Sequence, residues 1–119
     1  TTPDFTMALM GRAFARSRIP ENRLAALVAA DYDSALRLNP RLIYAWFNKG
    51  NLAYGAEDYT SALSCYSNAI EIDPSFGEAY YNRGLTYLRM GNRRQAFADL
   101  SKAGELGVVP SYNLLKRMK

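Results

Sequence analysis

The chain has 119 residues, of which 49% are hydrophobic and 22% are charged, and its net charge of +4 is mild. This is enough for one compact domain with a sizeable core, and the weak basic excess is a poor argument for a nucleic-acid partner. The sequence contains no histidine, which is the commonest general base and the commonest metal ligand. Its single cysteine, Cys65, excludes an internal disulfide, and we expect it to be a small packing residue. We therefore expect no enzymatic activity, no metal and no cofactor.

A repeat of 34 residues runs through the sequence. Residue pairs at this interval include Pro40 and Pro74, Gly50 and Gly84, Asn48 and Asn82, Ala62 and Ala96, and Ala69 and Ala103. A fixed period in this range is typical of helical units that cannot bury their apolar faces alone and therefore stack into a solenoid.

The first unit, residues 4–42, is the atypical one. Its second helix follows the repeat, but its first helix matches only after a shift of five residues, with Met7, Gly11 and Phe14 at the repeat positions. We therefore expect an insertion in the turn at residues 17–23, where Pro20 would break a helix.

The second unit, residues 43–76, shows the pattern most clearly. Trp46, Gly50 and Ala53 share one face of a first helix, and a second helix carries Ala62, Tyr66, Ala69 and Ile70 on one face. We expect Thr60 to cap the second helix and Pro74 to end it, because proline biases the preceding Asp73 away from helical geometry.

The third unit, residues 77–110, repeats this arrangement. Its first helix carries Tyr80, Gly84 and Tyr87; Gly91 and Asn92 form the turn; its second helix carries Ala96, Leu100 and Ala103. Val108 stands where Pro74 stood, so we expect Gly107 to end the helix in a left-handed conformation.

Residues 110–119 then predict a lone capping helix, giving an all-α solenoid of three hairpins plus this cap. The chain begins at Thr1 rather than methionine, so we expect it to be part of a longer protein.

These residues resemble the tetratricopeptide repeat family, whose pattern is Trp-x2-Leu-Gly-x2-Tyr, then Ala-x3-Phe, then Ala and Pro. The positions that carry the resemblance are Trp46, Gly50, Ala62, Tyr66, Ala69, Pro74, Tyr80, Gly84, Tyr87, Ala96, Leu100 and Ala103. The chain departs from the pattern at Lys49 and Arg83, where leucine is usual, at Val108 and in the insertion. We expect Gly50 and Gly84 to let helices approach closely, with Trp46 and Tyr80 filling the space that small residues leave.

The resemblance implies a concave groove lined by the first helix of each unit. The side of these helices opposite the glycines carries Tyr44, Phe47, Asn48, Asn51 and Tyr54, then Glu78, Tyr81, Asn82, Leu85 and Arg89, and in the first unit Arg12 and Arg16. Asn48 and Asn82 can pair with the backbone of an extended peptide or bond a neighbouring helix. The aromatic residues suit side-chain pockets, although packing between hairpins is the simpler role, and the arginines suit either an acidic segment or solvent.

The resemblance and the lack of catalytic groups predict a non-catalytic scaffold that binds a peptide or protein segment. The alternative is a helical-repeat module for single-stranded RNA, with which nine tyrosines and a positive charge are compatible. Reading bases would require polar residues at fixed places in every unit, and only Asn48 and Asn82 recur. Self-association through the outer face or the last helix is a further possibility.

Overall fold

The computed structural model describes residues 21–118, which form six α-helices and no strand. The helices are α1 (Glu21–Leu38), α2 (Ile43–Gly55), α3 (Tyr59–Ile72), α4 (Gly77–Arg89), α5 (Arg93–Glu105) and α6 (Pro110–Met118). The predicted all-α class is confirmed. The first expected helix, with Met7, Gly11, Arg12, Phe14 and Arg16, lies outside the described residues, as do residues 17–20 of the expected turn.

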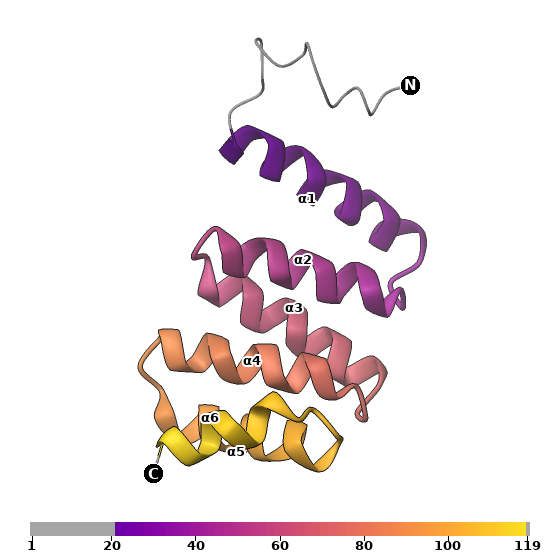
Figure 1. The fold of residues 1–119 in the computed structure, drawn as a ribbon. Coiled ribbons are helices and arrows are strands. Elements are labelled where there is room, and N and C mark those ends of the chain that lie inside the picture. Colours follow the sequence, from indigo (N-terminus) through magenta and orange to yellow (C-terminus); the bar gives the residue numbers. More distant parts are fainter. Residues whose placement is uncertain (1–20, 119) are drawn as a thin grey trace.

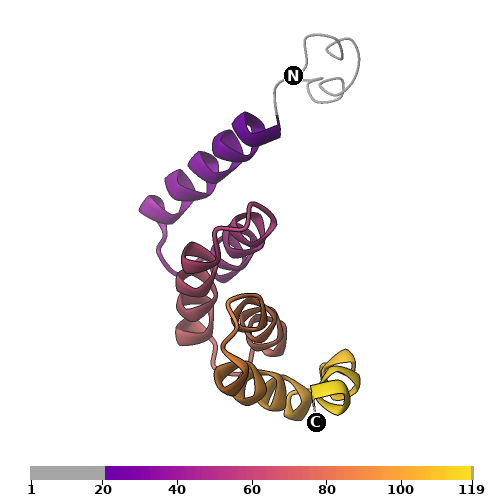
Figure 2. The same cartoon turned by 90° about the vertical axis from the view of Figure 1, so that its left-hand side faces the viewer.

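The helices stack in chain order (Figure 1), with α2 and α3 forming one hairpin and α4 and α5 the next. α1 packs on α2 at one end of the stack, and α6 packs on α5 at the other. The stack follows a curved path on which α2 and α4 lie on the inner side, while α1, α3 and α5 form the outer side (Figure 2). This is the arrangement expected of a helical solenoid.

The ends of several helices are set by local signals that the sequence shows. Asp73 is extended (φ −137°, ψ 94°) before Pro74, so α3 ends at Ile72 as predicted. Gly107 has a φ of 96°, which confirms its predicted left-handed conformation after α5. The Asn92 side chain accepts a hydrogen bond from the Gln95 N–H at 3.1 Å and so caps α5.

Two predicted boundaries differ from the structure. Thr60 does not cap α3, because Asp58 occupies the cap position and accepts a hydrogen bond from the Ser61 N–H at 3.3 Å. A carboxylate there also interacts favourably with the positive end of the helix dipole. α1 begins at Glu21, so residues 21–23 belong to the helix rather than to the turn. The acidic Glu21 favours a helix start at this position.

The core is built from small residues that face large ones. A Cβ atom on Gly50 would lie 2.7 Å from Tyr66 Cε1, and one on Gly84 would lie 2.8 Å from Leu100 Cγ. These two glycines therefore allow the close approach of paired helices that the sequence predicts. The alanines of the repeat pattern are fully buried, at 0% exposure: Ala62, Ala69, Ala96 and Ala103.

The large partners of the glycines differ from those expected. Trp46 and Tyr80 are only half-buried, and the Trp46 indole N–H donates to the Pro40 carbonyl at 2.9 Å. Tyr66 and Leu100 fill the space instead, because the glycines of the first helices face the second helices of their own hairpins. Cys65 is buried as expected of a packing residue, and burial raises the pKa of its thiol.

Candidate functional site

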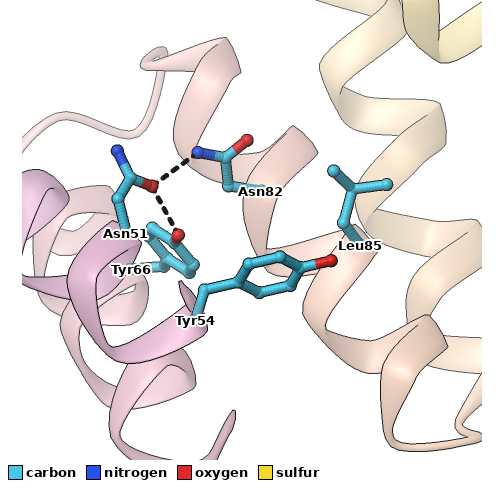
Figure 3. A pocket seen from close by; sticks show the side chains of 5 residues that line it. All are labelled: Asn51, Tyr54, Tyr66, Asn82 and Leu85. Carbon is cyan, nitrogen blue, oxygen red and sulfur yellow. Dashed lines mark hydrogen bonds between the residues drawn. The ribbon is translucent and has the colours of Figure 1, made fainter. Parts of the chain in front are cut away.

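A hollow of about 230 Å³ opens between α2, α3 and α4 and is lined by Asn51, Tyr54, Tyr66, Asn82 and Leu85 (Figure 3). Asn51 and Tyr54 are three residues apart on α2, as are Asn82 and Leu85 on α4, so each pair shares one helical face. Tyr66 reaches the hollow from α3. The hollow thus combines aromatic and aliphatic walls with two amide side chains.

Three of these side chains form a hydrogen-bond network. The Tyr66 hydroxyl donates to Asn51 Oδ1 at 2.5 Å, and Asn82 Nδ2 donates to the same oxygen at 2.8 Å (Figure 3). Tyr66 is only 1% exposed, and this burial raises the pKa of its hydroxyl far above the ordinary value. The hydroxyl therefore remains a donor throughout the physiological pH range.

An arginine is held at the wall of the hollow. Arg89 Nε donates to the Tyr54 hydroxyl at 3.1 Å, and the Arg89 guanidinium lies 5.9 Å from the centre of the Tyr54 ring. The hydrogen bond that Arg89 donates to Tyr54 raises the pKa of Arg89, which is exposed. The guanidinium therefore retains donors for a ligand while its orientation is restricted by Tyr54.

An aromatic cluster lies at the other end of α2. The Phe47 ring is 4.9 Å from Phe76, which immediately precedes α4, and 5.9 Å from Tyr66. Tyr44 meets Phe76 edge-on at 5.5 Å and is 65% exposed. Phe47 therefore packs between adjacent hairpins, whereas Tyr44 leaves most of its surface open.

The structure brings together only some of the residues that the sequence places in the groove. The hollow is lined by Asn51 and Asn82. Arg89 lies beside it because it donates a hydrogen bond to Tyr54, which is a lining residue. Asn48 is exposed on α2, and Tyr81 is half-buried on α4, but neither lines the hollow. The bond from Asn82 to Asn51 joins neighbouring helices, which is one of the two roles considered for this asparagine. Arg12 and Arg16 lie outside the described residues.

Tyr66 is the lining residue that the sequence reasoning assigned only to the core. Its ring does belong to the core, against Gly50, but its hydroxyl reaches the asparagines. The sequence offered one signal for this second role. Tyr66 carries a hydroxyl, whereas the matching residue of the next unit, Leu100, does not.

The two basic residues at usual leucine positions make ion pairs away from the hollow. Lys49 Nζ lies 2.5 Å from Asp33 Oδ1 and so joins α2 to α1. Arg83 pairs with Asp99 of α5 and also donates to Ser67 Oγ of α3 at 3.1 Å. These departures from the repeat pattern therefore connect helices rather than offering free charge to a ligand.

The described part of the chain contains neither a cluster of metal-binding side chains nor a helix that could span a membrane. Across residues 21–118, no three Cys, Asp or Glu side chains come together as a metal site would require. None of the six helices has the length and apolar character needed to cross a bilayer.

Comparison with known families identifies repeats in the second and third units. A family profile described as "TPR repeat" matches residues 50–91, and one described as "Tetratricopeptide repeat" matches residues 77–106. The Protein STIP1 homolog of Dictyostelium discoideum is 42% identical over 59 residues, which cover 50% of this chain and 10% of that protein. A UDP-N-acetylglucosamine--peptide N-acetylglucosaminyltransferase of Giardia intestinalis is 37% identical over 70 residues, 59% of this chain and 5% of the transferase. The chain thus spans a tenth or less of these curated relatives.

Solved structures give the same fold. YrrB, described as a TPR protein with an unusual peptide-binding site, superposes with a TM-score of 0.72 and 26% identity, covering 81% of this chain and 50% of YrrB. The first TPR of Spaghetti (RPAP3), solved with an HSP90 peptide, gives a TM-score of 0.71 at 19% identity, covering 75% of this chain and 72% of that one. At this identity the second likeness concerns the fold alone.

Proposed function

The chain belongs to the tetratricopeptide repeat family over residues 50–106, and we propose on this basis that it is a non-catalytic module that binds a peptide or protein segment in a groove along α2 and α4. The similarity to YrrB, which has a peptide-binding site, supports this proposal. None of the matched families or relatives favours the alternative of an RNA-binding module.

The hollow beside Asn51 and Asn82 is the observation that carries the proposal. It lies where α2 and α4, the inner helices of the stack, approach each other. Its volume of about 230 Å³ suits one large side chain of an extended segment rather than a whole cofactor. The rings of Tyr54 and Tyr66 and the Leu85 side chain supply apolar contact, and the two amides supply hydrogen bonds.

Catalysis is not supported by the groups around this hollow. No carboxylate lines the hollow, and of the adjacent pair Glu57 and Asp58 in the turn after α2, Asp58 is engaged in capping α3. The Giardia relative is an enzyme, but the alignment covers only 5% of its length. We therefore assign the module a binding role.

A linear-peptide display library tests this proposal. Peptides enriched on the immobilised chain should bind in solution, and Tyr54→Ala should weaken that binding by about tenfold or more because it removes one wall of the hollow. Phe97→Ala is the matched control, since Phe97 is an exposed aromatic residue on the outer helix α5. Equal affinity of the wild type and both variants, or no enrichment of any peptide, would refute the proposed groove.

A further inference from the structure

The inner helices α2 and α4 carry four charged side chains, and one of them makes no ion pair within the described chain. Lys49 and Arg83 form ion pairs with the outer helices, and Arg89 donates a hydrogen bond to a tyrosine hydroxyl. Glu78, in the first turn of α4, is exposed, and no hydrogen bond or ion pair among residues 21–118 involves its carboxylate. Glu78 therefore offers a ligand a negative charge on the inner side of the stack.

Glu78 lies at the end of the groove that holds the aromatic cluster of α2. It comes two residues after Phe76, whose ring meets Tyr44 edge-on at 5.5 Å. It also comes one turn before Asn82, which bonds α2, so Glu78 and Asn82 share one side of α4. The carboxylate and the Tyr44 ring therefore border the same end of the groove.

Tyr44 leaves an aromatic surface open at this end. It is 65% exposed, and its edge contact with Phe76 restricts the orientation of the ring. The face of an aromatic ring attracts a cation, and a carboxylate nearby adds to that attraction. The turns that precede α2 and α4 contribute one charge of each sign, from Arg41 and Asp73, and so leave Glu78 to set the sign here.

We propose that Glu78 and Tyr44 form a subsite for one basic side chain, so that the partner of this module is a segment that carries a lysine or arginine beside the residue that fills the hollow. The Glu78 carboxylate pairs with the ammonium or guanidinium group, and the Tyr44 ring provides a face for the same cation. This inference rests on the proposed peptide-binding function and names the class of segment that the same groove accepts.

The repeat argues against a purely structural role for Glu78. An acidic residue in the first turn favours a helix start, and Phe76 gives α4 no side-chain cap. The residue of α2 that corresponds to Glu78 is Tyr44, yet α2 also lacks a side-chain cap and has no acidic residue in its first turn. A first helix of this stack therefore begins without a carboxylate at this position.

The position of the subsite predicts where the basic residue stands in the ligand. Glu78 and Leu85, which lines the hollow, share one face of α4 and are two turns or about 10 Å apart. An extended segment that runs along the helix covers this distance in about three residues. Peptides selected on the immobilised chain should therefore carry Lys or Arg about three positions from a large apolar residue.

Glu78→Gln tests the subsite with such a peptide, because it removes the charge and keeps the shape. We expect binding to weaken by about threefold, and Tyr44→Leu to weaken it by a similar factor. Glu105→Gln is the matched control, since Glu105 is an exposed carboxylate at the end of the outer helix α5. Replacing the basic residue of the peptide by norleucine should abolish the effect of Glu78→Gln, which completes a double-mutant cycle.

Reversal of the charge supplies a second readout that a structural role would not give. Glu78→Lys should bind the peptide in which glutamate replaces the basic residue more tightly than the original peptide, whereas the wild type should prefer the original. If Glu78 only stabilises the start of α4, its variants will lower the melting temperature and will weaken the basic, neutral and acidic peptides equally. That result would overturn the proposed subsite.

The possible results also separate this inference from the proposed function. If the selected peptides carry no basic residue near the apolar one, or if Glu78→Gln binds as tightly as Glu105→Gln, the subsite is wrong. The binding function would still stand in that case, provided that Tyr54→Ala weakens the peptide and Phe97→Ala does not. Failure of Tyr54→Ala to weaken binding would remove both.

Discussion

Arg83 and Asp99 form a bidentate ion pair between α4 and α5, with both N–H···O distances at 2.8 Å. Asp99 is only 7% exposed, and its hydrogen bonds raise the pKa of Arg83 further above the physiological range. One repeat earlier, the same two positions hold Lys49 and Cys65. The third unit therefore buries a charge where the second buries a thiol.

Removal of one partner of this pair should be costly. Asp99→Ala leaves a half-buried guanidinium facing a buried gap, so we expect a loss of about 3 kcal/mol in the free energy of unfolding. Replacing both Arg83 and Asp99 by leucine should restore stability to within about 1 kcal/mol of the wild type, because no charge is then left unpaired. Urea denaturation measures both effects. Lys49→Leu is the control, since its pair with Asp33 is more exposed and should contribute less than about 1 kcal/mol.

The two glycines of α2 should respond oppositely to alanine. Gly50→Ala would place a Cβ atom 2.7 Å from the Tyr66 ring and 3.2 Å from Cys65 Cβ, so we expect a loss of about 1–3 kcal/mol. At Gly55 no atom lies within 4 Å of the added Cβ, so Gly55→Ala should be neutral or stabilise the helix by up to about 1 kcal/mol. The melting temperatures of the two variants measure these effects, and both substitutions lie in the same helix. A loss at Gly55 as large as that at Gly50 would contradict the close contact with α3.

Helix positions and ends were the most predictable part of this chain, because their signals are local. Pro74 and Gly107 act on the backbone beside them, and their effects were confirmed. The cap of α3 was assigned to Thr60 rather than Asp58 because both residue types can cap a helix, and the two positions are only two residues apart.

The candidate site was less predictable because its contacts join distant residues. The Tyr66–Asn51 bond spans 15 residues and the Asn82–Asn51 bond spans 31, so both depend on how helices pack. Helical spacing placed Asn51 and Asn82 on the groove side, but spacing alone did not show that they touch. Lys49 and Arg83 broke the repeat pattern, and only their partners on neighbouring helices explain why.

The turn between α2 and α3 contains a strained residue that glycine should relieve. Glu57 has a φ of 62°, and the matching residue of the next turn is Gly91, with a φ of 82°. A side chain is disfavoured in this left-handed region, so Glu57→Gly should stabilise the chain by about 1 kcal/mol. The melting temperature measures the gain. Gly91→Ala should lose a similar amount, and a gain from that control would contradict the explanation.

Alkaline pH should destabilise the fold through Tyr66. Burial raises the pKa of this hydroxyl well above the ordinary value of 10.0, which we take for the unfolded chain. As the pH rises above 10.0, the unfolded chain loses the Tyr66 proton while the native chain keeps it, so stability is full below this pH and falls above it. The loss approaches about 1.4 kcal/mol per pH unit. Urea denaturation at a series of pH values from neutral to strongly alkaline should show this fall in the wild type.

Tyr66→Phe separates this contribution from those of the other tyrosines and the lysines. The variant has no hydroxyl to ionise at this position, so its stability should fall less steeply than that of the wild type in the same alkaline range. Below the ordinary pKa of tyrosine, the difference between the two proteins should not vary with pH. Parallel pH profiles throughout would mean that the Tyr66 hydroxyl is not excluded from water in the native chain.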